Sequence, residues 1–347
     1  MSIIEQRIKQ LTVIIPAYNE ETHLADTILS IQNQTITPAE IIVVDDFSTD
    51  RTGEIAASLG VKVLRPPQNT GTKAGAQNFA LTGVETEYVM AIDADTTLAP
   101  DGIEKLMSGF KSESVAAVCG FVIPRIVKTI WERGRYIEYL FAFSFFKQIQ
   151  EYFDKPLISS GCFSAYKTDI LKSVGGWQTR TMAEDMDLTW TFYHMDYKVH
   201  FVPEAICYPI EPHNLHFMGK QLRRWSHGFL QNVRLHWRSV IHIPFLRNVV
   251  AVGLWDASIA SVAYIFILPL LAIYYSNPWF FLGYFIDMPT VIFPVMVTAV
   301  KRKEIMRAVS SIPSFFVLRF VNCFFMLNAV WAEFVINKPL TTYEKGH

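Results

Sequence analysis

The stretch EYVMAIDADTT, residues 87–97, joins a run of apolar residues to two aspartates, Asp93 and Asp95, that stand one residue apart. A short apolar run that ends in polar residues is typical of a buried β-strand. Side chains two residues apart lie on the same face of a strand, so the two carboxylates repel each other unless a cation or a proton relieves the repulsion. This stretch therefore predicts a buried strand with an acidic binding site at its carboxyl end.

Three further runs of the same kind lie at residues 11–19, 40–46 and 61–66, and segments with the apolar spacing of helices separate the four runs. Strands that alternate with helices predict an α/β fold with a mostly parallel sheet and helices on both of its faces. Ligands of such sheets bind beyond the carboxyl ends of the strands. The polar residues expected at that edge are Asn19, Asp45, Asp46, Asp93 and Asp95.

The composition of the 347-residue chain, 51% hydrophobic and 14% aromatic, is apolar for a purely soluble protein, so part of the chain must leave water. The formal net charge of −1 gives no support for a nucleic-acid partner. The four cysteines lie far apart without C-x-x-C spacing, which argues against a zinc site and a disulfide framework and for a reducing compartment. The first residues, MSIIEQRIKQ, predict neither a signal peptide nor a membrane anchor.

The second half of the chain changes character near residue 212. Residues 212–255 contain no Asp or Glu but six Lys or Arg among aromatic and aliphatic residues, a pattern that predicts one or two amphipathic helices on an anionic membrane surface. Three long apolar segments follow at about 249–275, 279–300 and 312–336, each near the ~20 residues that a spanning helix needs. We therefore predict about three transmembrane helices, with buried core helices as the alternative.

The charges between these segments predict an orientation. The loop KRKEIMR, residues 301–307, is basic, whereas the turn SNP, residues 276–278, has no charge. Basic loops stay on the cytoplasmic side, so the first half of the chain and the 301–307 loop are expected in the cytoplasm. The chain is thus expected to be an integral membrane protein, most simply of the plasma membrane.

The aspartate pair points to a divalent metal. Mg²⁺ or Mn²⁺ binds carboxylate oxygens and keeps other coordination positions open for substrate phosphates, so Asp93 and Asp95 would hold an ion that grips a diphosphate. The alternative is that one aspartate caps the helix expected after Pro100, or that both only close a turn. The D-x-D spacing alone leaves the two readings balanced.

An ordered series of motifs carries a family resemblance. The motifs are PAYNE (16–20), VDDFSTD (44–50), NTGTKAGAQNFAL (69–81), DAD (93–95), AED (183–185) and QLRRW (221–225). Together they resemble the family 2 glycosyltransferases, in particular the membrane-embedded Q-x-x-R-W branch of cellulose, chitin, hyaluronan and poly-N-acetylglucosamine synthases. IEY (137–139), TMAEDMDLTW (181–190) and PEAICYPIEP (203–212) are most similar to the bacterial poly-β-1,6-N-acetylglucosamine synthases. The resemblance, over about residues 11–236, implies a GT-A fold and a UDP-sugar donor.

The resemblance also implies which residues bind the donor. Ala17, Tyr18 and Glu20 would border the nucleotide, Asp46 would contact uracil, and Lys73 would lie near the phosphates. The local alternatives are packing for Tyr18, helix capping for Glu20 and a solvated surface position for Lys73.

The same resemblance gives roles to four acidic residues. Asp93 would contact the ribose or the metal, and Asp95 the metal itself. Asp185 would be the catalytic base, with Glu184 beside it on the acceptor side. The alternative for Asp185 is an N-cap of the helix that begins near MDLTWTF.

The motif QLRRW would complete the site. Gln221 and Arg224 would close over the leaving diphosphate, and Trp225 would stack on the acceptor sugar; packing at the membrane surface is the alternative for Trp225. Direct displacement with Asp185 as base would invert the anomeric centre. One departure from the family pattern is Phe47, which stands where a small residue is usual.

These expectations define three domains and a leading function. The domains are a cytoplasmic GT-A catalytic domain at 1–211, an amphipathic interface segment at 212–247 and a transmembrane region at 248–347. The leading hypothesis is an inverting transferase that adds GlcNAc or a related hexose from a UDP-sugar to a growing β-linked polysaccharide. The alternatives are single transfer to a membrane lipid, as in ceramide glucosyltransferases, and a silent scaffold or transport partner. Membrane lipid and a homo-oligomeric or accessory subunit are further expected partners.

Charged residues also occur in or near the apolar segments, where isolated charges are costly. They are Asp256, Asp287, Arg319 and Glu333. The two explanations are a path for a polar chain and pairing of helices through Arg319 and an acidic partner.

Overall fold

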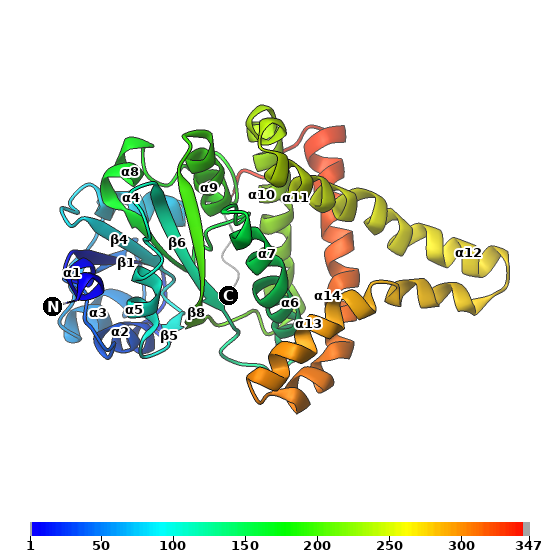
Figure 1. The fold of residues 1–347 in the computed structure, drawn as a ribbon, viewed down its shortest axis with the longest axis horizontal. Helices are drawn as coiled ribbons and strands as arrows, with labels where there is room; N and C mark the ends of the chain where they lie inside the picture. Colours follow the sequence, from blue (N-terminus) through cyan, green and yellow to red (C-terminus); the bar gives the residue numbers. More distant parts are fainter. Residues whose placement is uncertain (1, 343–347) are drawn as a thin grey trace. The chain divides into compact units, whose positions relative to one another are not determined.

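The computed structural model describes residues 2–342 and divides into two compact units (Figure 1). Unit 1 runs to Arg125 and includes Gln148–Ile210, whereas unit 2 contains Ile126–Lys147 and the described chain from Glu211 onward. The domain boundaries expected from the sequence stay a prediction. The structure adds that residues 126–147, which interrupt unit 1 in sequence, pack with the C-terminal helices.

Within the described residues, unit 1 contains one sheet of eight strands in the order β3-β2-β1-β4-β7-β6-β8-β5. The strands β3, β2, β1 and β4 are parallel neighbours, as are β6 and β8, while β7 runs antiparallel between β4 and β6. The expected α/β fold is confirmed, with a mixed sheet whose N-terminal part is parallel. The strands are β1 (Leu11–Ala17), β2 (Glu40–Asp45), β3 (Lys62–Leu64), β4 (Tyr88–Ile92), β5 (Thr97–Leu98), β6 (Val115–Val122), β7 (Phe163–Lys167) and β8 (Lys198–Tyr208).

Burial explains why these segments form strands. Every residue of β4 and of β6 is buried, which is typical of strands covered on both faces and accounts for their continuous apolar sequences. The helices that accompany the sheet are α1 (Ile3–Ile8), α2 (Leu24–Gln32), α3 (Thr52–Ser58), α4 (Lys73–Leu81), α5 (Gly102–Met107), α7 (Lys147–Tyr152), α8 (Thr168–Ser173) and α9 (Glu184–His194).

Unit 2 is helical and is built around α6, α10 and α14. Thr129 and Glu132 form a capping box at the start of α6, and Asn214 caps α10 by accepting from the N–H of Phe217. The elements are α6 (Ile130–Phe141), η1 (Ala142–Phe146), α10 (Leu215–His242), α11 (Pro244–Trp255), η2 (Asp256–Ala260), η3 (Ala263–Ile267), α12 (Leu268–Tyr274), η4 (Pro278–Phe285), α13 (Met288–Lys301), α14 (Ile305–Val330) and η5 (Trp331–Val335).

The segment expected to lie on the membrane surface is a single 28-residue helix, α10. Leu235, Trp237 and Ile241 are exposed on it, and it carries basic residues without any acidic one. Such a helix has the composition of an interfacial helix, as the sequence predicts.

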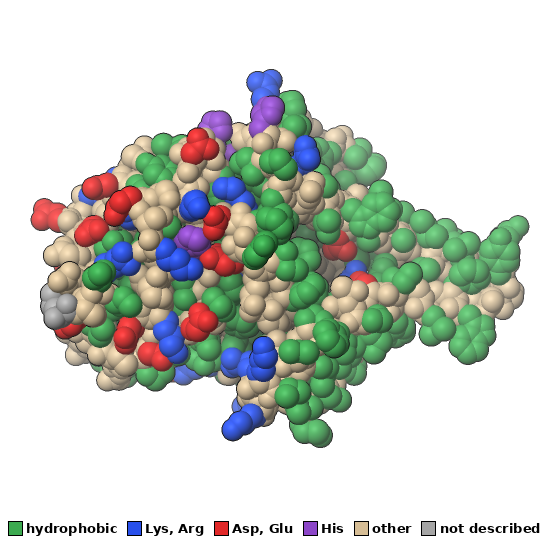
Figure 2. All heavy atoms as spheres, in the orientation of Figure 1, with side chains coloured by type: hydrophobic (Ala, Val, Ile, Leu, Met, Phe, Trp, Pro, Cys, Tyr) green, Lys and Arg blue, Asp and Glu red, His purple; other side chains and the backbone are tan. Residues whose placement is uncertain are grey.

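Two helices among residues 2–342 are long and apolar enough to cross a membrane: Pro244–Tyr274 and Ile305–Val335, each of 31 residues. They correspond to the first and third predicted spans. The second predicted span is a bent pair, Pro278–Phe285 and Met288–Lys301, which turns by 42° at the break. By length and composition the described residues therefore contain two candidate spans, or three if the pair counts as one. On the face drawn in Figure 2, hydrophobic side chains gather over α12, and charged side chains over unit 1.

The charged residues of these helices have polar partners within unit 2. Arg319 on α14 lies 2.5 Å from Asp287 and 3.5 Å from Asp256. Glu333 accepts from or donates to His227 Nδ1 at 2.6 Å, depending on which group carries the proton. Pairing relieves the cost of a charge among apolar helices, so the structure gives the helix-pairing explanation for these residues.

Gly134 allows the close approach of α6 and α14. A Cβ atom at this position would lie 2.8 Å from the carbonyl oxygen of Ser314 and 2.9 Å from Leu318 Cβ. Real Cβ contacts are longer than this, so a side chain at 134 would push the two helices apart.

We predict that Gly134→Ala destabilises unit 2 by about 1–3 kcal/mol, the usual cost of overpacking, because the backbone of α14 must move. The measurement is the melting temperature of the purified protein in detergent. Gly83→Ala is the matched control, since its Cβ would meet only the Ala80 carbonyl oxygen at 3.8 Å. Equal melting temperatures for the two variants would contradict the prediction.

Candidate active site

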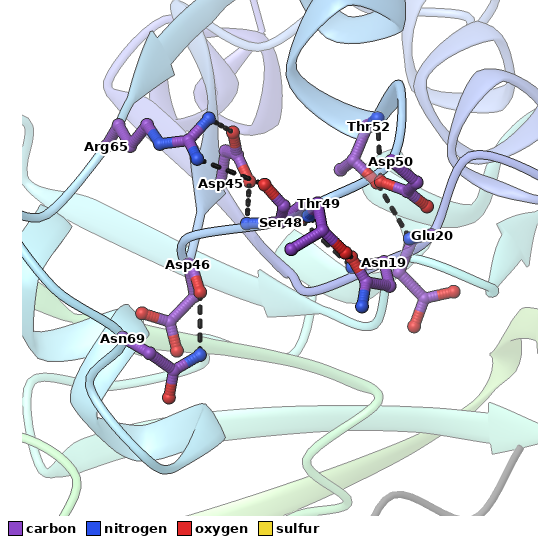
Figure 3. A network of polar contacts seen from close by, with 10 residues as sticks. All are labelled: Asn19, Glu20, Asp45, Asp46, Ser48, Thr49, Asp50, Thr52, Arg65 and Asn69. Carbon is purple, nitrogen blue, oxygen red and sulfur yellow. Dashed lines mark hydrogen bonds and ion pairs between the residues drawn. The ribbon is translucent and has the colours of Figure 1, made fainter.

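Two loops at the carboxyl ends of β1 and β2 hold each other in place (Figure 3). The two strands are parallel neighbours with Ala17 opposite Asp45, so the segments that follow them leave the sheet side by side. The N–H of Asn19 donates to Ser48 Oγ at 3.0 Å, and the Asn19 side-chain oxygen accepts from the N–H of Thr49 at 2.8 Å. These reciprocal bonds join the motif PAYNE to the motif VDDFSTD.

The residues expected to border the nucleotide lie at this edge. Ala17 is the last residue of β1, and the side chain of Tyr18 that follows is 43% exposed. Glu20 is buried, and its N–H donates to Thr52 Oγ1 at 2.8 Å. The three positions therefore lie together at the carboxyl end of β1, as their spacing predicts.

Asp50 anchors the start of α3 to the same loop. Its carboxylate accepts from the N–H of Thr52 at 3.0 Å, from the Thr52 hydroxyl at 2.5 Å and from the N–H of Glu21 at 3.1 Å. Burial alone would raise the pKa of Asp50, but these hydrogen bonds favour the charged form and lower the pKa overall. Asp50 therefore remains a charged acceptor at neutral pH and fixes both motifs.

The adjacent residues Asp45 and Asp46 have different partners. Asp45 pairs with Arg65 Nη1 at 2.9 Å and accepts from the N–H of Ser48 at 2.9 Å. Both oxygens of Asp46 accept from Thr70, one from its N–H and one from its hydroxyl, at 2.8 Å each. Asp45 thus fastens the turn, while Asp46 faces the loop that begins NTGT.

Phe47 has an unusual backbone for a bulky residue, with φ at +70°. Its side chain is 45% exposed, and the guanidinium carbon of Arg65 lies 5.1 Å from the ring centroid. A cation–π contact of this kind contributes about 0.5–1 kcal/mol at exposed sites and offsets part of the strain. The departure from the family pattern at this position is therefore stabilised by a neighbour, Arg65.

A continuous set of contacts joins Asp93 to Asp185. Lys73, the first residue of α4, forms an ion pair with Asp93, and its Nζ donates to the carbonyl oxygen of Gly161 at 2.9 Å. The N–H of the same glycine donates to Asp185 Oδ2 at 2.8 Å. Gly161 lies here because β7 pairs antiparallel with β4, with Phe163 opposite Ile92. Three of the predicted site residues are thus brought together by a backbone segment.

The helix α9 places Asp185 in its first turn. α9 begins at Glu184 with Ala183 as its N-cap, so Asp185 is not the capping residue, and its Oδ1 accepts from the N–H of Met186 at 2.9 Å. Glu184 is buried. Acidic residues at this position are favoured by the positive end of the helix dipole.

Asp187 in the same turn has a structural role. Its side chain is fully buried, and it takes two hydrogen bonds from Arg180, at 2.7 and 2.8 Å. Such a bidentate pair satisfies both oxygens of the carboxylate. Asp187 therefore fixes the start of α9, while Asp185 faces Gly161.

The donor set at the end of β4 fits a divalent metal that shares its coordination with a ligand. Asp95 is buried, and Asp93 is paired with Lys73. No group of three or more His, Cys, Asp or Glu within residues 2–342 has the arrangement of a metal site by itself. Two carboxylates suit Mg²⁺ or Mn²⁺, which take their other ligands from water and phosphate oxygens.

The motif QLRRW lies on α10 of unit 2. Gln221 and Trp225 are four residues apart and so share one face of the helix, with Arg224 one position before Trp225. The oxygen of Gln221 accepts from Arg135 at 2.6 Å, and the side chain of Trp225 is 36% exposed. These residues belong to unit 2, whereas the contacts from Asp45 to Asp187 belong to unit 1.

Several residues of the site are absent from the sequence-based prediction. Arg65 lies in the run VKVLRP, just before Pro66, and Gly161 lies in SSGC, where no local pattern indicates a role. Thr70 lies within the motif NTGTKAG, and its neighbour Asn69 donates to the carbonyl oxygen of Asp46 at 2.7 Å. Of these residues, only Asn69 and Thr70 lie within a motif that the sequence itself indicates, NTGTKAGAQNFAL.

Comparisons with known proteins agree with this architecture. The model of the family described as glycosyl transferase family 2 matches residues 12–175. The poly-beta-1,6-N-acetyl-D-glucosamine synthase of Staphylococcus epidermidis is 30% identical over 228 residues, 64% of this chain and 55% of that protein. The synthase of the same name from Staphylococcus aureus is 28% identical over 222 residues, 63% and 54% of the two chains. The chain thus spans about half the length of these relatives.

A solved structure is similar over most of the chain. The mannosyltransferase PcManGT from Pyrobaculum calidifontis, in complex with GDP-Man and Mn²⁺, gives a TM-score of 0.61 at 18% identity, over 94% of this chain and 87% of that chain. At this identity the likeness establishes the fold alone. The expected GT-A fold is confirmed.

Under the function proposed below, we predict that Gly161→Ala lowers turnover of a UDP-sugar at least ten-fold, because a Cβ atom at 161 would lie 3.0 Å from Asp185 Oδ2 and 3.2 Å from Lys73 Nζ. Both side chains would have to shift, and small displacements of reacting groups are costly. The measurement is the rate of UDP release, with Gly83→Ala as control. Unchanged turnover in Gly161→Ala would show that the position of this segment does not matter.

Proposed function

We propose that the chain, whose residues 12–175 match the model of glycosyl transferase family 2, is a membrane-bound, inverting glycosyltransferase. The proposed reaction moves GlcNAc or a related hexose from a UDP-sugar to a growing β-linked polysaccharide. The observation that carries the proposal is the set of contacts from Asp93 through Lys73 and Gly161 to Asp185. These contacts bring Lys73, a candidate cation for the phosphates, and Asp185, a candidate base, to the backbone of Gly161.

Asp185 is the proposed general base. Its two oxygens accept from the N–H groups of Gly161 and Met186 at 2.8 and 2.9 Å, which fixes the plane of the carboxylate. Each carboxylate oxygen can accept a second hydrogen bond, so a lone pair remains for another donor. We assign that lone pair to the acceptor hydroxyl, whose proton Asp185 removes as the glycosidic bond forms.

The reaction balances as a single displacement. The acceptor oxygen bonds to the anomeric carbon, the bond from that carbon to the diphosphate oxygen breaks, and UDP leaves with the electron pair. An α-linked donor therefore gives a β-linked product. Lys73 is proposed to neutralise the diphosphate, and Gln221 and Arg224 are given the same task on motif resemblance alone. Ala17, Tyr18, Glu20 and Asp46 are proposed to bind the nucleoside.

Asp95 and Asp93 are proposed to hold Mg²⁺ or Mn²⁺. A pair of carboxylates supports this, because these ions keep coordination positions for phosphate oxygens. When bound, such an ion supplies positive charge against the leaving diphosphate.

The acceptor is proposed to be a polysaccharide. Support comes from the relatives, two of which are named as poly-beta-1,6-N-acetyl-D-glucosamine synthases. Trp225 is proposed to stack on the acceptor sugar, with Glu184 beside the acceptor hydroxyl. A membrane lipid is the alternative acceptor. Incubation with UDP-GlcNAc, followed by sizing of the products, separates the two acceptors. A polymeric product supports the proposal, and a glycolipid with a single added sugar contradicts it.

The site is proposed to face the cytoplasm, where UDP-sugars are made. The apolar helices and the basic 301–307 loop support an integral membrane protein in this orientation.

We predict that a cysteine at Lys303 is shielded from an impermeant thiol reagent in intact cells, whereas one at Asn277 reacts. The parent protein with its four native cysteines gives the background labelling, and the reverse pattern would invert the orientation.

We predict that EDTA abolishes turnover and that added Mg²⁺ or Mn²⁺ restores it, because the proposed ion offsets charge on the diphosphate. Asp95→Ala should lose turnover with an unchanged melting temperature. Asp26→Ala, a surface carboxylate paired with Arg125 on the same unit, is the control. Full turnover in EDTA would remove the metal from the mechanism.

We predict that Asp185→Asn lowers transfer by roughly 10² to 10⁴, the range for loss of a general base, because the amide cannot accept the hydroxyl proton. UDP affinity by calorimetry should stay unchanged, since the amide keeps the size of the side chain. Asp26→Asn, at a surface carboxylate of the same unit, is the matched control and should retain the rate. Near-normal transfer by Asp185→Asn together with a loss in Glu184→Gln would make Glu184 the base instead.

A further inference from the structure

Arg135, a residue of α6 outside all of the proposed roles above, is fully buried and surrounded by polar groups of unit 2. Its Nη1 donates to Glu138 Oε2 at 2.5 Å, and its Nε lies 3.5 Å from Glu211 Oε2. Its Nη2 donates to Gln221 Oε1 at 2.6 Å and contacts Met218 Sδ at 3.1 Å. Both Nη atoms of the guanidinium therefore donate hydrogen bonds, whereas its buried Nε is within ion-pair distance of Glu211 but donates none to the described residues.

The same guanidinium also lies over two aromatic rings. Its central carbon is 4.5 Å from the centroid of Trp225 and 5.6 Å from that of Tyr139. Arg135, Glu138 and Tyr139 share one face of α6 because they stand three and four residues apart, and Gln221 and Trp225 do so on α10. One side chain thus contacts two residues of the motif QLRRW.

Electrostatics hold this arrangement. Burial alone would lower the pKa of Arg135, but the carboxylate of Glu138, with that of Glu211, outweighs burial and raises the pKa. Burial raises the pKa of Glu211, against the opposing effects of Arg135 and of the hydrogen bond from the Tyr139 hydroxyl at 2.9 Å. Arg135 therefore stays charged and keeps its ion pair with Glu138.

Burial of such a cluster is not explained by stability. Replacing buried ion pairs with apolar residues of similar volume is often neutral or stabilising. What the cluster does provide is orientation. Gln221 Oε1 accepts from Arg135, and Gln221 Nε2 lies 3.4 Å from Glu211 Oε2, so the two partners together define which way the amide points.

We propose that Arg135 is a positioning residue for transfer, which holds the Gln221 amide and the Trp225 indole of α10 in their working orientation. The proposal rests on the proposed function, in which Gln221 binds the diphosphate and Trp225 stacks on the acceptor. Arg135 covers one face of the indole, and the 36% exposure of Trp225 leaves surface for a sugar. Arg135 acts through these two side chains and touches no reacting atom.

Arg135→Lys tests the proposal in the full-length protein in detergent. Lysine keeps the charge but has a single ammonium, which cannot pair with Glu138, donate to Gln221 and cover the indole together. We expect kcat/KM for a short β-1,6-linked GlcNAc oligosaccharide to fall at least ten-fold, while the affinity for UDP alone changes less than two-fold. Arg133→Lys, two residues away on the same helix, should change neither value.

A double-mutant cycle separates positioning from general damage. In a Trp225→Ala background the indole is already lost, so Arg135→Lys should cost markedly less than it costs in the wild type. Losses that multiply in full would overturn the proposal. If Arg135→Lys does not fold, Glu211→Gln replaces it, because that change removes the carboxylate that both Arg135 and Gln221 approach, and the same non-additivity is expected.

A readout without turnover keeps the proposal distinct from the proposed function. In protein labelled with 5-fluorotryptophan, the fluorine signal of Trp225 is assigned by its loss in Trp225→Phe. Arg135→Lys should shift or broaden this signal, and Arg133→Lys should leave it in place. A wild type inactive with every UDP-sugar would overturn the proposed function alone, whereas an unmoved Trp225 signal in Arg135→Lys would overturn the positioning role.

Discussion

Repulsion among carboxylates at one edge of a sheet is the constraint around which unit 1 is arranged. Three of the acidic residues there have distinct donors: Asp45 has Arg65, Asp93 has Lys73, and Asp185 has the N–H of Gly161. The donors come from segments remote in sequence. Since uncompensated buried charges are costly, the loops at this edge are fixed by charge compensation as much as by apolar packing.

In unit 2, charged side chains among apolar helices are also compensated by opposite charges. Arg319 pairs with Asp287 and Asp256, and Arg135 with Glu138 and Glu211, so in both places one arginine serves two carboxylates. An arginine suits this because its five N–H donors lie in a fixed plane. Such a cluster specifies rotation and register between helices, which apolar side chains leave less well defined.

The sequence predicted what depends on local pattern and missed what depends on register. The strands and the acidic ends of β2 and β4 were predictable because apolar runs and polar ends are local signals. Gly161 was not, because its place beside Asp185 follows from β7 entering the sheet antiparallel to β4. Arg135 was missed for the same reason: it stands two residues before the motif IEY, and its contacts with Gln221 and Trp225 depend on how α6 packs against α10.

Hydrogen-bond capacity separates the roles of Asp45 and Asp46. The carboxylate of Asp45 pairs with Arg65 and accepts from the N–H of Ser48 in the turn. The same arginine lies over the ring of Phe47, whose backbone is strained. Asp45 and Phe47 therefore stabilise the fold. Asp46 accepts one bond from Thr70 at each oxygen, and each oxygen has a second lone pair. Under the proposed function a uracil N–H can therefore add to Asp46 without displacing Thr70. The loop at 69–72 then remains in place when the nucleotide arrives, and Lys73, which follows it directly, starts from the same position in both states.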